Sequence, residues 1–220
     1  MNRRQVKEFI EEGENLQIEF KRKFTTHEKI AREMIAFANT RGGYILFGID
    51  DDKTIVGVES EKSEAELILK TANEYCQPSL NIKLDYINLD DKEIVVASIS
   101  ESGNKPHRLQ DYKNELEVNT AEVVIRVNDK SVLASKEMIR LMIARSNNLE
   151  LKKYSLGELE KSVFEFLLNN ETITVKELSK HANISERRAS RTLVKLVRAN
   201  LLMIHIKNNG EEYFTNAGSS

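Results

Sequence analysis

The sequence predicts an α+β domain followed by a smaller, mostly helical one, and three observations favour this division. The chain has 220 residues, more than an average single domain needs at about 100–200 residues. Up to about residue 146, short runs of β-branched and aromatic residues alternate with helical patterns, whereas later elements are short and mostly helical. We therefore expect an N-terminal mixed-sheet domain over residues 1–146 and a C-terminal domain over residues 155–216, joined by the polar linker Arg145–Tyr154.

The first strand of the N-terminal domain is indicated by alternation. In the segment LQIEFK, the apolar residues Leu16, Ile18 and Phe20 alternate with polar ones. Since side chains along a strand point to opposite faces in turn, this pattern predicts a half-buried strand. Its polar face would carry Glu19 and Lys21 together.

Stop signals define the remaining N-terminal elements. Helical spacing in HEKIAREMIAFANTR predicts a helix that the Gly42-Gly43 pair ends, and the buried strand YILFGI follows. Turns at Asp50–Lys53 and Asp90-Asp91 indicate two hairpins, the first leading into a short second strand. The other expected elements are a helix over Ser63–Cys76, strands over Ile82–Leu89, Glu93–Ser100 and Glu122–Val127, and a helix over Ser135–Ala144.

The C-terminal elements come in an order that is typical of one motif. A helix over Leu159–Leu168 is followed by a capping box from Thr174 to Glu177, which opens a second helix. Ser185 caps a third helix that reaches about Ala199, and an NNG turn separates two strand-like pieces. Helix, helix, turn, helix and hairpin is the order of a winged helix-turn-helix.

The third helix of this motif carries a basic stripe. At about 100° per residue, five cations fall on one face, with Glu186 as the only acid nearby, and apolar residues fall on the opposite face. Crowded cations repel one another unless a polyanion lies alongside, and this helix of the motif is the one that enters a major groove. We therefore expect nucleic acid as the partner, DNA in preference to RNA, although a solvated face or a protein-binding module would show the same pattern. The expected nucleic-acid-binding residues are Arg187, Arg188, Arg191, Lys195 and Arg198, with Lys207 and His205 of the hairpin adding backbone contacts.

Composition excludes several classes of protein. The 33 basic and 35 acidic residues nearly cancel, but residues 151–220 hold 11 basic and 8 acidic ones, so the basic excess lies in the C-terminal domain. No apolar run approaches the about 20 residues that cross a bilayer, and no secretory segment is visible, so we expect no membrane partner. The lone cysteine, Cys76, fits a cytoplasmic location.

Carboxylates of the N-terminal domain form a second candidate site. Glu14 precedes the first strand, Glu19 lies on its polar face, and Asp50 and Asp51 follow the buried strand YILFGI. If these strands are neighbours, Glu14, Glu19 and Asp50 would converge on a hard cation, Mg²⁺ or Mn²⁺, which activates water against a phosphodiester. Lys21 would hold a phosphate or offset the charge. The alternative is an ordinary acidic turn and a surface glutamate.

Four segments together resemble a known family. They are EFK with a glutamate upstream, AFANTRGGYILFGIDDD, the KPHR loop and IRVNDKSVLAS. Over about residues 8–145 the chain is similar to the Alba-like domain of the Schlafen family, which in prokaryotes is often joined to a winged helix in transcriptional regulators. The ATP-binding label that such proteins often carry has no support in this sequence, because it lacks a GxxxxGK[ST] loop.

The resemblance also implies an alternative function. Eukaryotic relatives include endoribonucleases that cut tRNA with two glutamates and an aspartate, and the motif places these roles on Glu14, Glu19 and Asp50 or Asp51. Those nucleases hold two such domains and a zinc site in one chain, whereas this chain has one copy and a single cysteine. A homodimer would restore a two-lobed groove.

Three further residues have open roles. His107 and Arg108 lie in the family's loop, where they would touch a phosphate or face solvent. Arg126 lies on an expected strand as either a groove cation or a paired structural one.

Taken together, the sequence predicts a homodimeric, DNA-binding transcriptional regulator. The first alternative is a metal-dependent endoribonuclease that acts on tRNA or rRNA, with Mg²⁺ or Mn²⁺ as its cofactor. The second is a scaffold for protein partners.

Overall fold

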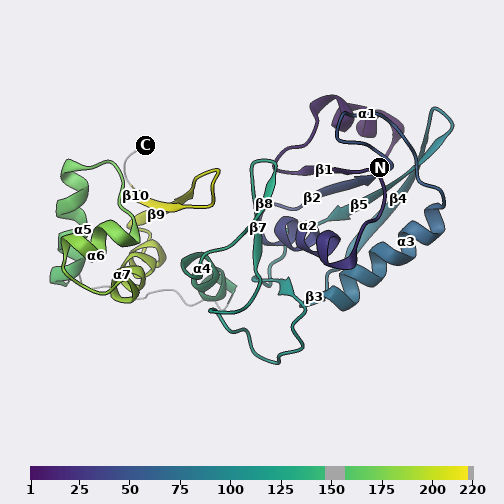
Figure 1. The fold of residues 1–220 in the computed structure, drawn as a ribbon. Coiled ribbons are helices and arrows are strands. Elements are labelled where there is room, and N and C mark those ends of the chain that lie inside the picture. Colours follow the sequence, from purple (N-terminus) through teal and green to yellow (C-terminus); the bar gives the residue numbers. More distant parts are fainter. Residues whose placement is uncertain (147–156, 218–220) are drawn as a thin grey trace. The chain divides into compact units, whose positions relative to one another are not determined.

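The computed structural model describes residues 1–146 and 157–217, which form two compact units, Met1–Leu133 and Ala134–Ser220 (Figure 1). The division falls at Leu133, earlier than the expected boundary after residue 146. The reason is that helix α4 (Lys136–Ser146) packs on α7 (Glu186–Arg198) of the second unit. Most of the expected linker lies outside the described residues.

The first unit is built on a four-stranded mixed sheet in the order β1-β2-β5-β4 (Figure 1). β1 and β2 are parallel, and the other two pairs are antiparallel. Helix α2 (His27–Asn39) connects the parallel strands, which need such a crossover. The expected α+β class is thus confirmed. The strands are β1 (Ile18–Lys21), β2 (Gly43–Phe47), β4 (Ile82–Leu89) and β5 (Lys92–Ile99).

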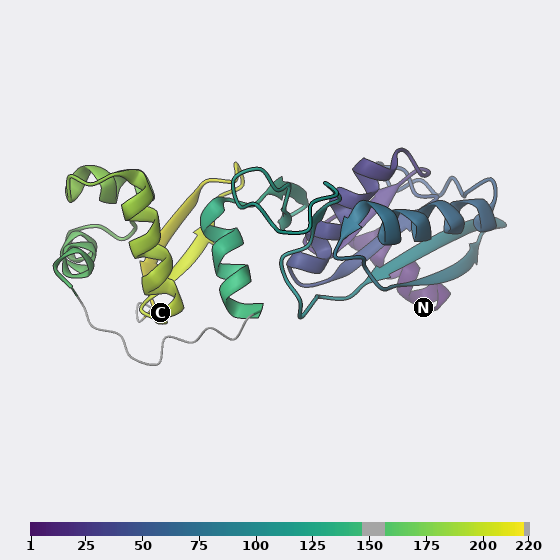
Figure 2. The ribbon, with the colours of Figure 1, turned by 90° about the horizontal axis from the view of Figure 1, so that it is seen from below.

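Helices cover both faces of this sheet. α2 and α3 (Glu61–Lys70) pack on one face, around Phe37 and Ile68, and Figure 2 shows α3 lying along the strands. α1 (Arg3–Glu12) packs on the other face through Val6. β1 is therefore buried on both faces, and its expected polar face is wrong: the side chain of Glu19 is inside the unit.

Two small antiparallel ribbons complete the first unit. The expected last strand is present as β7 (Val124–Val127), but it pairs with a strand that was not predicted, β8 (Lys130–Leu133), and not with the main sheet. The expected hairpin after Asp50 is reduced to one bridge between Ile49 and Ile55.

The second ribbon begins where a helix was expected. α3 ends at Lys70 and continues as the π-helical turn η1 (Thr71–Tyr75), so that Cys76 lies in a strand. The ribbon consists of β3 (Cys76–Gln77) and β6 (Arg108–Leu109).

The second unit has the expected winged helix-turn-helix fold. α5, α6 and α7 are followed by an antiparallel hairpin, β9 and β10, and Ile173 adds a bridge to Phe214 of that hairpin. The core includes Val163, Leu178 and Leu193, one from each helix. The remaining bounds are α5 (Glu158–Asn169), α6 (Val175–His181), β9 (Leu202–Ile206) and β10 (Glu212–Asn216).

Gly43 at the start of β2 generates a prediction about stability. A Cβ atom there would lie 2.4 Å from Cδ1 of the fully buried Phe37 and 2.7 Å from the carbonyl oxygen of Gln17. Since neither can move aside cheaply, we expect Gly43→Ala to lower the free energy of unfolding by about 1–3 kcal/mol in urea titrations. Gly103→Ala is the control, because nothing lies within 4 Å of its Cβ position. Equal effects of the two variants would contradict this account of Gly43.

Candidate functional site

Helix α7 is positioned by hydrogen bonds of the turn that precedes it. The side chain of Ser185 accepts a bond of 3.3 Å from the backbone N–H of Arg188, which caps the helix as predicted. In the turn, Asn183 has a φ of 49°, a left-handed conformation that asparagine tolerates better than most residues. The Oγ of Ser179 on α6 donates to the carbonyl of Ile184 at 2.6 Å. The turn thereby fixes the direction in which α7 leaves it.

One side of α7 is completely buried. Ala189, Leu193, Leu196 and Val197 are at most 5 % exposed and pack in the core of the second unit, as the helical spacing predicted. Burial of four such side chains fixes the rotation of the helix about its axis, since any turn would expose apolar surface. The opposite side must then face outward.

Three arginines occupy that outward side. Arg187, Arg188 and Arg191 are exposed, and none forms an ion pair with any of the described residues. The prediction of an exposed basic stripe is confirmed for these three positions. Their charges are solvated and available to an anionic partner.

The other two members of the predicted stripe differ. The Nζ atom of Lys195 lies 3.2 Å from Oε1 of Glu160 on α5, so Glu186 is not the only acid near the stripe. Arg198, at the end of α7, is half-buried. Sequence spacing along one helix could not show Glu160, because the pair joins two helices 35 residues apart.

Helix α4 covers one flank of the stripe. Ser190 and Val194 of α7 are buried there. The Oγ of Ser190 donates to the carboxylate of Glu137 and accepts a bond of 3.1 Å from Nη1 of Arg140, and both partners are on α4. A cation beside α7, Arg140, was therefore missed, because the polar linker after α4 had placed that helix in the first domain.

The two residues of the hairpin that were expected to contact nucleic acid differ in their surroundings. Lys207 is exposed at the turn, with Nζ 3.6 Å from a carboxylate oxygen of Glu211. His205 instead stacks on Tyr213 with ring centroids 5.0 Å apart, and its Nε2 lies 2.9 Å from Oγ1 of Thr215. His205 is thus held by its own hairpin.

The predicted carboxylates of the first unit have separate partners. Oε1 of Glu14 accepts a bond of 2.9 Å from the backbone N–H of Phe20, and Asp50 pairs with Arg22 at 2.9 Å. Burial raises the pKa of Glu14, and the negative charges of Glu19 and Asp51 act in the same direction. Among the residues that the structure describes, no three His, Cys, Asp or Glu side chains are grouped so that they could hold a metal ion. The donor set expected for Mg²⁺ or Mn²⁺ is therefore not assembled.

The buried carboxylate of Glu19 forms an ion pair with Arg126. The Nη2 atom of Arg126 lies 2.6 Å from Oε2 of Glu19, and its Nη1 atom lies 3.0 Å from Oε2 of Glu33. Nη2 also donates to the carbonyls of Asn15 and Ile18, at 3.0 and 3.1 Å. With a side chain only 1 % exposed, Arg126 is a paired structural cation, which decides between the two roles left open for it.

A basic cavity of about 520 Å³ lies next to this network. Lys21, which also bonds to Glu19, lines it together with Asp50 and Asp51. Four further cations and the half-buried Glu33 were not singled out from the sequence, although RKFTTHEKIAR is rich in positive charge. The missed lining residues are Arg22, Lys23, Thr25, Lys29, Arg32, Glu33 and Ser131.

The loop residues His107 and Arg108 are buried, at 3 and 4 % exposure. Nδ1 of His107 lies 2.8 Å from the carbonyl of Pro78, and Nε2 lies 2.7 Å from Oγ of Ser102. Burial lowers the pKa of His107. Both side chains stabilise their loop, and neither faces a phosphate or solvent as the alternatives for them had supposed.

The fold and the exposed arginines define the class of the second unit: a winged helix-turn-helix domain with a basic, exposed face on its third helix. Residues 14–135 match the family model "Schlafen, AlbA_2", and residues 151–214 match the model "Sugar-specific transcriptional regulator TrmB". Because the first match spans more than half of the sequence, the chain belongs to the Schlafen AlbA_2 family. In the described residues no helix is long and apolar enough to cross a membrane.

Individual relatives are more distant. An uncharacterized ATP-binding protein of Ureaplasma parvum, UU034, is 29 % identical over 177 residues, which are 71 % of this chain and 48 % of that protein. The chain thus spans about half the length of this curated relative. The structure titled "N-terminal Domain of Putative ATP-dependent DNA Helicase RecG-related Protein", from Nitrosomonas europaea, has a TM-score of 0.39 and 23 % identity, and the match covers 46 % of this chain and 73 % of that one. The DIP2311 protein of Corynebacterium diphtheriae has a TM-score of 0.44 and 12 % identity, and covers 92 % of this chain and 34 % of its own.

Arg126 generates a prediction about stability. Its replacement by methionine would leave the carboxylate of Glu33 without a cation and that of Glu19 with Lys21 alone, and breaking a buried pair in this way costs about 3–5 kcal/mol. We expect Arg126→Met to lower the free energy of unfolding by that amount in guanidinium titrations. Arg32→Met is the matched control: its pair with Glu122 is partly exposed, so the loss should stay below about 1 kcal/mol. A small loss for Arg126→Met would mean that these carboxylates do not depend on it.

Glu212 on β10 generates a prediction about pH. Burial raises its pKa from 4.5 to about 7, the charge of Glu137 acts likewise, and a hydrogen bond with Ser135 opposes them. The folded protein therefore holds a proton that the unfolded chain releases, and stability due to this carboxyl is present below pH 4.5 and lost as the pH rises through about 7.

We expect Glu212→Gln to remove this loss. Relative to the variant, the wild type should lose unfolding free energy as the pH rises from 4.5 through about 7, and the difference should then level off. Glu211→Gln, at an exposed neighbouring position, should show no change of that sign. A difference that does not vary with pH for Glu212→Gln would refute the shift.

Proposed function

We propose that this chain is a DNA-binding transcriptional regulator that places α7 in a major groove. One observation carries the proposal: Arg187, Arg188 and Arg191 are exposed on one side of α7 and make no ion pair with the described residues. The buried side of the same helix prevents them from turning inward.

The dimensions and the charge of α7 suit this role. Its 13 residues make a helix about 20 Å long, and a B-DNA major groove, about 12 Å wide, admits an α-helix. Arg187 and Arg191 lie one turn apart and repel each other in the free protein. Phosphates on either side of the groove would relieve that repulsion and release condensed counterions.

Two further features support a regulator. The similarity of residues 151–214 to the TrmB model is a similarity to transcriptional regulators. Lys207 at the turn of the hairpin supplies a cation for a neighbouring phosphate. Because one winged helix reaches few bases, the proposal includes a homodimer that binds two half-sites.

The basic cavity of the first unit has a separate part in this proposal. It is lined by five cations and three carboxylates, so it has a net positive charge. It would supply phosphate contacts that do not depend on base sequence. The proposal assigns no catalytic role to Glu19, because Arg126 and Lys21 pair with its carboxylate.

The test is a salt titration of binding to a fluorescent 30-base-pair duplex, read by anisotropy. We expect the double variant Arg187→Gln/Arg188→Gln to bind roughly tenfold or more weakly at moderate salt. The slope of log affinity against log salt should fall by about two, one for each lost phosphate contact. Sedimentation of the complex then gives the number of chains per duplex.

The control removes two exposed cations of the second unit that lie outside α7, Arg145→Gln/Lys161→Gln. It changes the net charge equally and should leave the slope nearly unchanged. Equal slopes for the two double variants would reject α7 as the contact helix. Tighter binding to single-stranded or duplex RNA than to duplex DNA would reject DNA as the target.

A further inference from the structure

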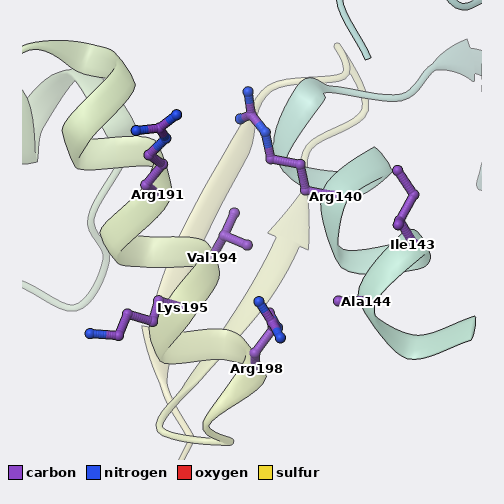
Figure 3. A pocket seen from close by; sticks show the side chains of 7 residues that line it. All are labelled: Arg140, Ile143, Ala144, Arg191, Val194, Lys195 and Arg198. Carbon is purple, nitrogen blue, oxygen red and sulfur yellow. The ribbon is translucent and has the colours of Figure 1, made fainter. Parts of the chain in front are cut away.

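A cavity of about 410 Å³ lies between α4 and α7 of the second unit (Figure 3). Its size falls within the range of about 300–1,000 Å³ that is typical of small-molecule sites. The residues that line it are Arg140, Ile143, Ala144, Arg191, Val194, Lys195 and Arg198.

The cavity combines apolar walls with cations, of which Arg140 and Arg191 lie toward one end and Arg198 toward the other (Figure 3). Val194 points from α7 toward α4, whose Ile143 and Ala144 complete the apolar part (Figure 3). The guanidinium groups of Arg140 and Arg191 extend toward the same end of the cavity (Figure 3). None of the described residues that line it is acidic. Such a cavity is complementary to a molecule with one anionic group and an apolar body.

Arg140 is already oriented for this purpose. Its Nη1 atom donates to Oγ of Ser190 at 3.1 Å and lies 3.4 Å from Oε1 of Glu137, while Ser190 itself donates to Glu137. These bonds use one end of the guanidinium, which has five N–H donors in a rigid fork. The remaining donors can make paired hydrogen bonds to the oxygens of a carboxylate or phosphate.

We infer that this cavity is a binding site for a small organic anion, an apolar group that carries a phosphate or carboxylate. The anionic group lies between Arg140 and Arg191, and the apolar body lies against Ile143, Ala144 and Val194. Lys195 has less part in it, since it pairs with Glu160 and points away from α4 (Figure 3).

Occupancy of this site would act on DNA binding. Arg191 belongs both to the cavity and to the exposed face of α7, so an anion bound to it competes with a DNA phosphate. By linkage, DNA lowers the affinity for the anion by the same factor as the anion lowers that for DNA. This coupling rests on the proposed function, whereas binding of the anion does not.

The first test uses hexyl phosphate with the full-length protein and no DNA. Titration followed by methyl NMR should shift the signals of Ile143, Ala144 and Val194 in a saturable way. Inorganic phosphate supplies only the anionic half of the ligand and 1-hexanol only the apolar half, so each should bind at least tenfold more weakly than hexyl phosphate. Equal affinity for hexyl phosphate and either half, or shifts confined to other methyl groups, would overturn the site.

Three variants locate the contacts. Arg140→Gln should weaken hexyl phosphate about tenfold, the value of one charge-assisted hydrogen bond. Arg145→Gln, on the same helix but outside the cavity, should leave its affinity unchanged. Ala144→Phe should fill the cavity and abolish binding; if circular dichroism shows that it does not fold, Ile143→Trp replaces it. Unaltered affinity in both Arg140→Gln and the filled variant refutes the assignment.

The coupling is then measured separately. Saturating hexyl phosphate should weaken binding of the wild type to the 30-base-pair duplex about tenfold and leave the filled variant, which retains its α7 cations, unaffected. If hexyl phosphate binds and DNA affinity does not change, competition through Arg191 is wrong while the site stands. If the protein does not bind DNA at all, the proposed function fails and the NMR titration still decides on the anion.

Discussion

The second unit depends on one constraint, the division of α7 into a buried and an exposed side. Leu193 and Leu196 are fully buried among α5, α6 and the hairpin, and this burial sets the rotation of the helix. Arg187 and Arg191 are outside because Leu193 is inside, on a helix with 3.6 residues per turn. The exposed charges thus repel one another, and burial of the apolar side of α7 in the core offsets the free-energy cost of that repulsion. A helix held less firmly would turn its arginines toward the nearest carboxylates.

In the first unit the corresponding constraint is the buried charge of Arg126. Burying a charged guanidinium without hydrogen-bond partners costs a large amount of free energy, so the elements around Arg126 must supply oxygen atoms that accept its hydrogen bonds. β1 supplies Glu19 and the carbonyl of Ile18, and α2 supplies Glu33. The ring of Phe37 lies 4.9 Å from the guanidinium carbon. The strand pattern predicts Glu19 as a member of a catalytic group of carboxylates. In the structure, its carboxylate instead pairs with Arg126 and helps to bury that charge. What remains open to solvent beside this pair is a cavity with more cations than acids.

Most helices and helix caps depend on neighbouring residues and could be predicted from the sequence, whereas pairings between distant residues could not. The capping box at Thr174 and Glu177 and the basic stripe of α7 are local patterns, and both are present. The fate of Glu19 depends on Arg126, which lies 107 residues further along the chain, and no spacing rule connects them. The same holds for α4, whose partner α7 follows only after a polar segment that looks like a domain boundary. Candidate sites failed where a distant cation or helix determined the surroundings.

The position of α4 beside α7 gives the second unit a surface that a bare winged helix lacks. Without α4 beside it, such a helix would leave its exposed arginines equally accessible to any anion in solution. With α4 alongside, Arg191 has two possible anionic neighbours, and a single guanidinium cannot satisfy a DNA phosphate and a cavity-bound anion fully at once. The coupling between the two must therefore be negative unless the anion moves α4, because each ligand removes a donor that the other needs. Of the three exposed arginines of α7, Arg191 alone lines the cavity, so a bound anion leaves the DNA contacts of Arg187 and Arg188 in place. An effector acting here would weaken DNA binding in a graded way and would not abolish it.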